Sequence, residues 1–358
     1  MKTEHLTFTR FVAAIVIVFF HFGVDAPPFD NNFFRPLIVN AGLSVSYFFI
    51  LSGFVMIVAY GNKARPFNTA LYLRNRAARI LPLYYTAIVL MIIYYFLRVN
   101  VLNTPSNYYV NTYDTLLNSL LIQAWIPEKA FTLNPPAWSL SVEAFFYLAF
   151  PFIFYRLYKK LSYRAFMMFT IAFFIVSQLV FHFLIYTWPE QLYFFYFLPA
   201  LRLNEFLIGN GLGALFLMQR KGWKNSGYLL VVLLTVSIYV LRKDVSPLDF
   251  HNGLFAIFFA PMLFVLAMNQ GAINRLFSKR PFVFLGEISY GVYLLQYPVY
   301  FFFTSTLTFF GRKITPPLFY VYLLILLVVS AASYIFIELP LRNRIRKTHA
   351  TTQTKAAQ

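Results

Sequence analysis

The first apolar segment of the chain carries two ionisable side chains, Arg10 and His21, eleven residues apart. Eleven residues make close to three turns of an α-helix, so both side chains share a face, about 16 Å apart along the axis. Ionisable groups inside a membrane span are costly and usually functional. Because a neutral imidazole can accept the proton of a hydroxyl, His21 is a candidate general base. The alternative is a histidine that only packs against a neighbouring helix.

A carboxylate at a similar predicted depth is placed to assist that histidine. Glu143 lies just over one turn inside an apolar segment that opens with Trp138, and Ser141 lies two residues before it. Such a carboxylate can orient and polarise an imidazole, as the third member of a catalytic triad does. The alternative is a carboxylate that is stabilised only by the dipole at a helix N-terminus.

Two arginines precede the third apolar segment and are suited to binding phosphate. Arg76 and Arg79 are three residues apart and share a helical face, with Arg74 beside them. The planar guanidinium group binds oxygen atoms in pairs, which favours phosphate groups as ligands. The alternative is ordinary positive charge on the cytoplasmic side of a membrane protein.

A third set of charges lies within the sixth apolar segment. Arg202 and Glu205 are three residues apart, a spacing that predicts an ion pair inside the membrane. The alternative is a role in the wall of an active site. We identify no metal-ligand cluster, and the chain has no cysteine. We therefore expect no metal ion, no thiol nucleophile and no bound cofactor.

The elements that position these residues are predicted to be transmembrane helices. Of the 358 residues, 60% are hydrophobic and only 12% are charged, whereas soluble domains carry about 25% charged residues. A span needs about 20 apolar residues. The sequence therefore predicts an all-α, polytopic membrane helix bundle of about ten transmembrane helices, at 6–23, 40–60, 80–97, 138–156, 165–187, 192–218, 227–241, 252–269, 283–305 and 318–338.

The positions of lysine and arginine predict the topology. Most of them lie in alternate loops that share one side with both ends of the chain, so both termini are predicted to be cytoplasmic. The net charge of +18 is thus attributed to topology and not to nucleic-acid binding. We expect an uncleaved first helix, an outer loop at 98–137 whose segment 113–126 is too short to cross, one transmembrane domain at 1–345, and a disordered cytoplasmic tail at 346–358.

Taken in order, these motifs resemble acyltransferase family 3, the bacterial membrane O-acyltransferases that include O-antigen acetylases. The resemblance covers nearly the whole chain, and each motif is weak alone. Its motifs here are Arg10 and His21; Gly42–Phe54, which contains Ser52; Arg76 and Arg79; Trp138–Tyr147; Arg202, Glu205 and Gly209; Ser289, Tyr290, Tyr293 and Leu294; and Glu338–Pro340. Members often carry His-x-Pro after the Ser-Tyr stretch, whereas this chain has Gln296 there, so a second catalytic histidine is not expected.

The resemblance implies the transfer of an acyl group, most often acetyl, from cytoplasmic acyl-CoA to a hydroxyl of an exported or lipid-linked glycan. Catalysis would rest on His21 and Glu143, and donor binding on Arg10, Arg76 and Arg79. A wall of the site would include Ser52, Trp138, Ser141, Arg202, Glu205, Tyr290 and Gln296. The implied location is the bacterial inner membrane.

A second function class is compatible with the residues alone. A non-enzymatic glycan or lipid transporter would equally have many helices and buried charges, but it would not need His21 aligned with Arg10. The sequence leaves open the acceptor, the length of the acyl chain, direct transfer against an acyl-enzyme intermediate, and the oligomeric state.

Overall fold

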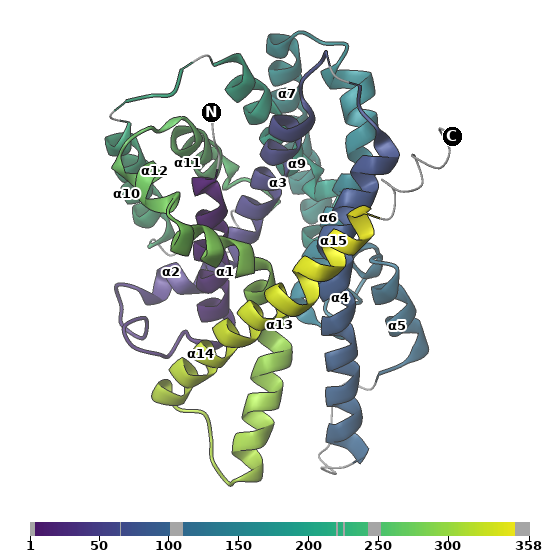
Figure 1. The fold of residues 1–358 in the computed structure, drawn as a ribbon, viewed down its shortest axis with the longest axis vertical. Helices are drawn as coiled ribbons and strands as arrows, with labels where there is room; N and C mark the ends of the chain where they lie inside the picture. Colours follow the sequence, from purple (N-terminus) through teal and green to yellow (C-terminus); the bar gives the residue numbers. More distant parts are fainter. Residues whose placement is uncertain are drawn as a thin grey trace. The chain divides into compact units, whose positions relative to one another are not determined.

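The computed structural model describes residues 4–64, 66–100, 110–219, 221–224, 226–242 and 252–347. Over these residues the chain forms helices joined by loops, with no strand beyond one isolated bridge between Trp223 and Asn269 (Figure 1). The all-helical prediction is therefore confirmed for the described part of the chain. The predicted tail at 346–358 lies, beyond Lys347, outside the described residues.

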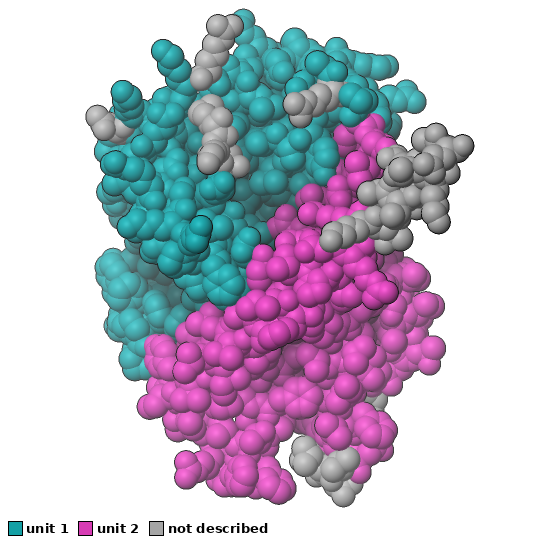
Figure 2. Space-filling view, in the orientation of Figure 1, with its two compact units in different colours: residues 1–66, 149–289 teal, residues 67–148, 290–358 magenta. Residues whose placement is uncertain are grey.

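The chain divides into two compact units that alternate along the sequence. Unit 1 comprises residues 1–66 and 149–289, and unit 2 comprises residues 67–148 and 290–358 (Figure 2). Two helices, α6 (Trp138–Phe152) and α13 (Arg280–Phe309), pass from one unit into the other. The prediction of one transmembrane domain over 1–345 stays a prediction.

Unit 1 is built around a close pair of helices, α3 (Ser44–Tyr60) and α9 (Pro199–Met218). The pair packs through glycines, because a Cβ atom at Gly209 would lie 2.0 Å from the Ile50 carbonyl oxygen and one at Gly53 would lie 2.0 Å from that of Phe206. Small residues allow two backbones to approach in this way. The remaining elements of unit 1 are α1 (His5–Phe22), α2 (Arg35–Val39), η1 (Ala41–Leu43), η4 (Ile153–Tyr158), α7 (Tyr163–Thr187), η5 (Pro189–Gln191), α8 (Leu192–Phe197), α10 (Gly227–Leu241), α11 (Ala256–Met268) and α12 (Ala272–Phe277).

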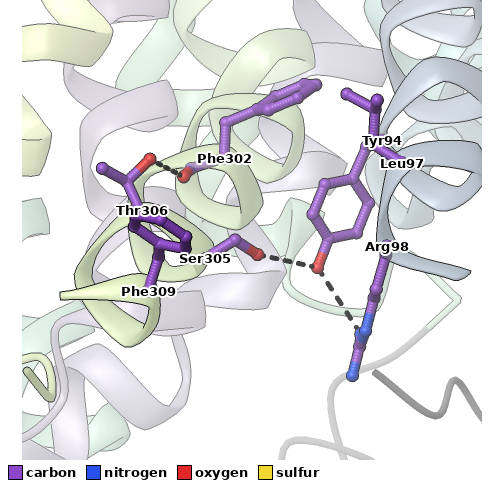
Figure 3. Close-up of a pocket in the computed structure, with 7 residues that line it drawn as sticks. All are labelled: Tyr94, Leu97, Arg98, Phe302, Ser305, Thr306 and Phe309. Atoms are coloured by element: carbon purple, nitrogen blue, oxygen red, sulfur yellow. Dashed lines mark hydrogen bonds between the residues drawn. The ribbon is translucent and has the colours of Figure 1, made fainter. Parts of the chain in front are cut away.

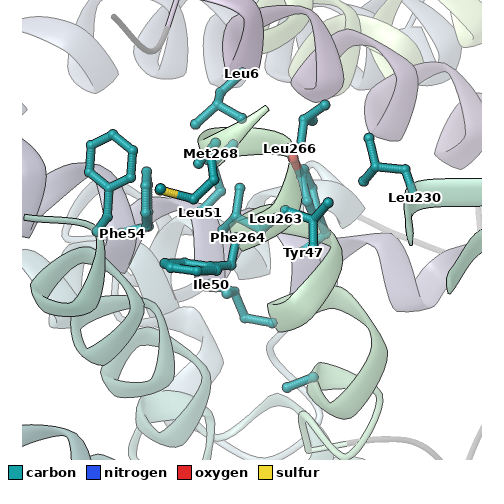
Figure 4. Packing of buried hydrophobic residues seen from close by; sticks show 14 of the residues in the cluster. Leu6, Tyr47, Ile50, Leu51, Phe54, Leu230, Leu263, Phe264, Leu266 and Met268 are labelled. Carbon is teal, nitrogen blue, oxygen red and sulfur yellow. The ribbon is translucent and has the colours of Figure 1, made fainter. Parts of the chain in front are cut away.

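A buried apolar cluster in unit 1 joins α3 to α11 (Figure 4). Ile50 and Phe54 of α3 lie in it with Leu263 and Met268 of α11, and all four are almost fully buried. Leu6 extends the cluster to α1. The helix that carries Arg10 and His21 is thereby held against the centre of unit 1.

Unit 2 contains the long helix α4 (Thr69–Asn100), against which η7 (Tyr334–Glu338) and α15 (Leu339–Lys347) pack. The other elements of unit 2 are α5 (Thr112–Ser119), η2 (Gln123–Trp125), η3 (Pro135–Ala137) and α14 (Pro316–Ser333). The short helix α5 is capped by Asn111, whose side chain accepts a hydrogen bond from the Asp114 amide at 2.7 Å. With eight residues, α5 is too short to cross a membrane.

Six helical stretches among the described residues are long and apolar enough to cross a membrane: His5–Phe22, Ala41–Tyr60, Thr69–Asn100, Pro135–Tyr158, Tyr163–Thr187 and Pro316–Arg346. Two shorter apolar helices, α10 and α11, coincide with predicted spans. Each of the ten predicted segments contains a helix, but the number of crossings and the orientation of the termini stay predictions.

One predicted segment, 192–218, is not a continuous helix. It is divided into α8 and α9 at Leu198, whose backbone is extended with ψ of 118°. Pro199 follows, and the residue before a proline is disfavoured in the helical region by contact with the proline ring. The α9 helix then begins with proline in its first turn, where no amide donor is needed.

Candidate functional site

The predicted line of Arg10 and His21 lies on one uninterrupted helix of unit 1, α1. Both side chains are half-buried, and His21 lies in the last turn, one residue before the helix ends at Phe22. The imidazole ring contacts Phe20 and Phe22, with ring centroids 5.1 and 5.8 Å away. The partial negative charge at a helix C-terminus stabilises a cation, which suits a group that gains a proton during a reaction.

The predicted ion pair of Arg202 and Glu205 forms in unit 1. The Arg202 Nε atom lies 2.9 Å from Glu205 Oε2, and the two side chains are 1% and 0% exposed. Arg202 also donates to Ser46 Oγ of α3 at 3.2 Å, and its guanidinium lies 5.4 Å from the ring centre of Phe49. This pair therefore joins α9 to α3 in the interior of the unit. The other predicted wall residue of α3, Ser52, is half-buried.

In unit 2, Glu143 and Arg76 meet at the same tyrosine. The Tyr147 hydroxyl donates a hydrogen bond to Glu143 Oε1 one turn away on α6, and the Arg76 guanidinium of α4 lies 5.8 Å from the centre of the Tyr147 ring. Glu143 and Arg76 are half-buried, whereas Tyr147 is buried. The structure thus brings a predicted donor-binding arginine and a predicted catalytic carboxylate into one cluster.

Further polar groups of unit 2 belong to this cluster. Arg79 is half-buried and lies within electrostatic range of Tyr147. Tyr290 of α13 donates to the Ile80 carbonyl at 2.9 Å, and it lies within electrostatic range of Glu143 and Glu338. We call Arg76, Arg79, Glu143, Tyr147, Tyr290 and Glu338 the unit 2 polar cluster.

Three other predicted wall residues of unit 2 serve to join its elements. Trp138 is the first residue of α6 and is buried, while Ser141 donates to the Leu121 carbonyl at 2.6 Å. Gln296 is fully buried and donates to the Tyr293 carbonyl at 2.7 Å. The Tyr293 hydroxyl in turn donates to the Pro136 carbonyl at 3.1 Å, at the start of α6. The Tyr293 hydroxyl also lies 2.8 Å from Ser139 Oγ, so it links α13 both to η3 and to α6, the helix that carries Glu143.

Sequence reasoning did not assign two members of the cluster, Tyr147 and Glu338. Tyr147 carries a detectable signal, because a residue four places after Glu143 lies on the same face of a helix. Glu338 ends the π-helix η7, and π-helical turns are frequent at functional sites but are not readable from sequence. Among the described residues, no three histidine, aspartate or glutamate side chains gather as ligands for a metal ion.

The predicted catalytic partners His21 and Glu143 belong to different units, so their pairing stays a prediction. Within each unit, the structure brings together some of the predicted residues: Arg202 with Glu205 in unit 1, and Arg76, Arg79, Glu143 and Tyr290 in unit 2. The predicted catalytic and donor-binding roles also stay predictions.

Comparison with known proteins supports one family. The family model described as an acyltransferase domain, that of acyltransferase family 3, matches residues 4–336. The chain is 29% identical to the acyltransferase MdmB of Streptomyces mycarofaciens over 84% of this chain and 79% of that protein. It is 23% identical to the O-acetyltransferase OatA of Staphylococcus aureus over 88% of this chain and 55% of that protein, so it spans about half of OatA.

No solved structure matches the chain. The family match extends across the helices that carry Arg10, His21, Arg76, Glu143 and Arg202, and six helical stretches are suited to crossing a membrane. The chain therefore belongs to acyltransferase family 3 and is a multi-pass membrane acyltransferase that transfers groups other than amino-acyl groups.

Proposed function

We propose that the protein transfers an acyl group, most simply acetyl, from cytoplasmic acyl-CoA to a hydroxyl of an exported or lipid-linked glycan. The similarity to OatA, an O-acetyltransferase, supports oxygen as the acceptor atom. The observation that carries the proposal is the contact of Tyr147 with both Glu143 and Arg76. It links a carboxylate suited to catalysis with a cation suited to holding a phosphorylated donor.

The proposed donor is held by its phosphates. Arg76 and Arg79 lie near the N-terminal end of α4, on the predicted cytoplasmic side, and Arg10 lies near the corresponding end of α1. Guanidinium groups bind phosphate through paired, charge-assisted hydrogen bonds, which are roughly twice as strong as neutral ones. In this proposal the three arginines bind the CoA phosphates, and the thioester end of the donor reaches His21.

The proposed reaction is a direct acyl transfer with His21 as general base. A ring nitrogen of His21 takes the proton of the acceptor hydroxyl as its oxygen attacks the thioester carbonyl carbon. The new carbon–oxygen bond forms, the carbon–sulfur bond breaks, and the CoA thiolate leaves and receives that proton. A two-step route, in which His21 first accepts the acyl group and then passes it to the hydroxyl, uses the same residue.

Glu143 is proposed to stabilise the charge that His21 gains. An ionised carboxylate has two oxygens and about four acceptor positions, so the bond from Tyr147 leaves capacity for a second partner. Positioned carboxylates hold an imidazole in the reactive tautomer and stabilise the imidazolium that forms.

The chain is proposed to work in the bacterial inner membrane with both termini in the cytoplasm, as the distribution of lysine and arginine favours.

The proposal is tested in membrane vesicles that contain the protein and are supplied with acetyl-CoA labelled in the acetyl group. The readout is label in the glycan fraction for the wild type and for His21→Ala at matched protein level. We expect the loss of the general base to lower transfer by a factor on the order of 10²–10⁴.

His182→Gln is the matched control. This second histidine lies in α7 and its Nδ1 atom is bonded to the Gln178 carbonyl, 2.8 Å away. The His182→Gln substitution should leave acetyl transfer unchanged. Near-normal transfer by His21→Ala would refute the role of His21 as base. If the wild type transfers no label and also binds no CoA, the proposed donor is wrong.

A further inference from the structure

A cavity in unit 2 lies far along α4 and α13 from the unit 2 polar cluster. Its volume is about 200 Å³, and Figure 3 shows the side chains around it. The lining residues are Tyr94, Leu97 and Arg98 of α4 and Phe302, Ser305, Thr306 and Phe309 of α13. On the predicted topology this is the outer end of both helices, opposite to the proposed donor arginines.

Hydrogen-bond donors converge at one wall of this cavity. Ser305 Oγ donates to the Tyr94 hydroxyl oxygen at 3.4 Å, and Arg98 Nη1 approaches the same oxygen at 3.5 Å (Figure 3). A phenol oxygen has two acceptor positions and one proton. With two donors directed at its oxygen, Tyr94 retains its own proton to donate. None of the seven lining residues is acidic, so this wall combines the positive charge of Arg98 with hydroxyl groups that can donate or accept.

The other walls are apolar and partly rigid. Phe302 packs against Tyr94 edge to face, with ring centroids 5.4 Å apart, and Phe301 stacks on Tyr94 with ring centroids 5.1 Å apart. Leu97 and Phe309 complete the apolar lining, and Phe309 is 74% exposed. An occupant must therefore combine an anionic, acceptor-rich group with an adjoining apolar chain.

We propose that this cavity binds the phosphate head and first carbons of a lipid phosphate, the carrier of a lipid-linked acceptor. Phosphate oxygens accept hydrogen bonds and carry negative charge, which matches the Arg98 guanidinium beside the Tyr94 hydroxyl, whereas a neutral sugar ring would leave the charge of Arg98 unused. The apolar walls suit the adjoining chain, which can continue past Phe309 into the bilayer. This inference rests on the proposed function, because it names the class of the acceptor.

The size of the cavity agrees with a head group and not with a whole glycan. Its volume is about 200 Å³. Pockets for drug-sized ligands begin at about 300 Å³. The glycan itself would then lie outside this cavity, attached to the phosphate that the cavity holds.

The test measures binding directly, without acyl transfer. Full-length protein in phosphatidylcholine nanodiscs is titrated with dodecyl phosphate, dodecyl glucoside or inorganic phosphate, and Kd is obtained from the shift in thermal midpoint. We expect dodecyl phosphate to bind most tightly. In the Arg98→Gln variant, the Kd for dodecyl phosphate should rise roughly tenfold or more, because a charge-assisted bond to phosphate is lost. Phe309→Ala should also raise it, by a smaller factor.

Two matched variants control for general effects. Phe310→Ala removes a neighbouring ring that is 70% exposed and does not line the cavity, and Arg312→Gln removes an exposed cation just beyond α13. Both should bind dodecyl phosphate like the wild type. Equal binding by Arg98→Gln, or equal binding of dodecyl glucoside, would overturn the inference.

Further measurements identify the source of the phosphate and test this inference separately from the proposed function. Equal binding of inorganic phosphate, or loss of dodecyl phosphate binding in nanodiscs that contain phosphatidylglycerol, would overturn the assignment of a lipid-linked acceptor. Acyl transfer without dodecyl phosphate binding would overturn this inference and leave the proposed function intact. Binding through Arg98 in a protein that never consumes acetyl-CoA would support the lipid phosphate site and refute the proposed function.

Discussion

Unit 1 and unit 2 each contain arginine and glutamate in close association, but in different surroundings. In unit 1, Arg202 and Glu205 bind each other directly, and both are almost completely buried. In unit 2, Arg76 and Glu143 are both half-buried and both contact Tyr147. The first arrangement pairs its two charges directly, whereas in the second the two charged groups meet at one tyrosine and are less deeply buried.

The difference indicates which charges are available for chemistry. Taking two charges out of water costs several kcal/mol per ion, and their mutual attraction offsets this cost only while the pair is intact. Arg202 and Glu205 therefore act as one structural unit between α9 and α3. The groups around Tyr147 are less deeply buried than this pair, so we expect them to be the ones that exchange contacts with a substrate. We expect changes in the two regions to affect different measurements.

The largest effect is expected from breaking the buried pair of unit 1. Glu205→Ala leaves the Arg202 charge buried and uncompensated, so the protein should lose about 3–5 kcal/mol of stability. The measurement is the unfolding midpoint in detergent. The double variant Arg202→Met with Glu205→Leu removes both charges and should recover most of the loss. If Glu205→Ala keeps full stability but loses acyl transfer, Arg202 and Glu205 belong to the active site. The distinction between a structural pair in unit 1 and reactive groups in unit 2 would then be wrong.

Removing the charge of Glu143 should lower acyl transfer and leave stability nearly unchanged, the reverse of what we expect for Glu205→Ala. Glu143→Gln keeps the size of the side chain, so the unfolding midpoint should stay near that of the wild type. Transfer of labelled acetyl groups should fall on the order of 10²-fold, because the positive charge formed on the proposed base loses its partner. Glu190→Gln, at an exposed position, is the control. If Glu143→Gln lost as much stability as Glu205→Ala, Glu143 would have a structural role like that of Glu205.

A change at Arg76 should act on donor binding. Arg76→Ala removes a charge-assisted contact worth about 1.5–3 kcal/mol, so the KM for acetyl-CoA should rise roughly 10–100-fold with a smaller change in kcat. Arg156→Ala removes an exposed arginine from the same predicted side of the membrane and should leave KM unchanged. Equal effects of the two variants would assign Arg76 to topology.

The smallest effect is expected at the tyrosine between Arg76 and Glu143. Tyr147→Phe keeps the ring beside Arg76 but removes the hydrogen bond to the Glu143 carboxylate. Glu143 keeps its charge and loses only an orienting contact, so transfer should fall about fivefold, which corresponds to about 1 kcal/mol, with the KM for the donor unchanged. Tyr155→Phe, at an exposed position on η4, should have no effect. A rise in donor KM for Tyr147→Phe would show that the hydroxyl also positions Arg76.

Much of the helical architecture could be predicted because it depends on local patterns. Long apolar runs identify α1, α3, α4, α6, α7 and α14, and six such stretches meet the requirements of a span. The division at Leu198 was missed although Pro199 signals it. The apolar run at 192–218 is nearly continuous, so the sequence predicts a single helix there despite Pro199.

The candidate site was predictable residue by residue but not as an arrangement. Spacing alone placed Arg10 with His21 on one helix and Arg202 beside Glu205. The contact of Tyr147 with Arg76 joins α6 to α4, and no helical period relates residues on two different helices. Glu338 entered the cluster only through the packing of η7 in unit 2.

The sequence by itself determined the all-helical class, the membrane environment, the family and the candidate catalytic residues. These properties follow from hydrophobicity, helical period and motif order, which are local or additive along the chain. The tertiary structure alone decided that Ser46 accepts from Arg202, that Tyr147 joins Arg76 to Glu143, and that Tyr94 and Arg98 border a cavity. Such contacts depend on how helices distant in sequence pack, because each helix can present its polar groups to many possible neighbours.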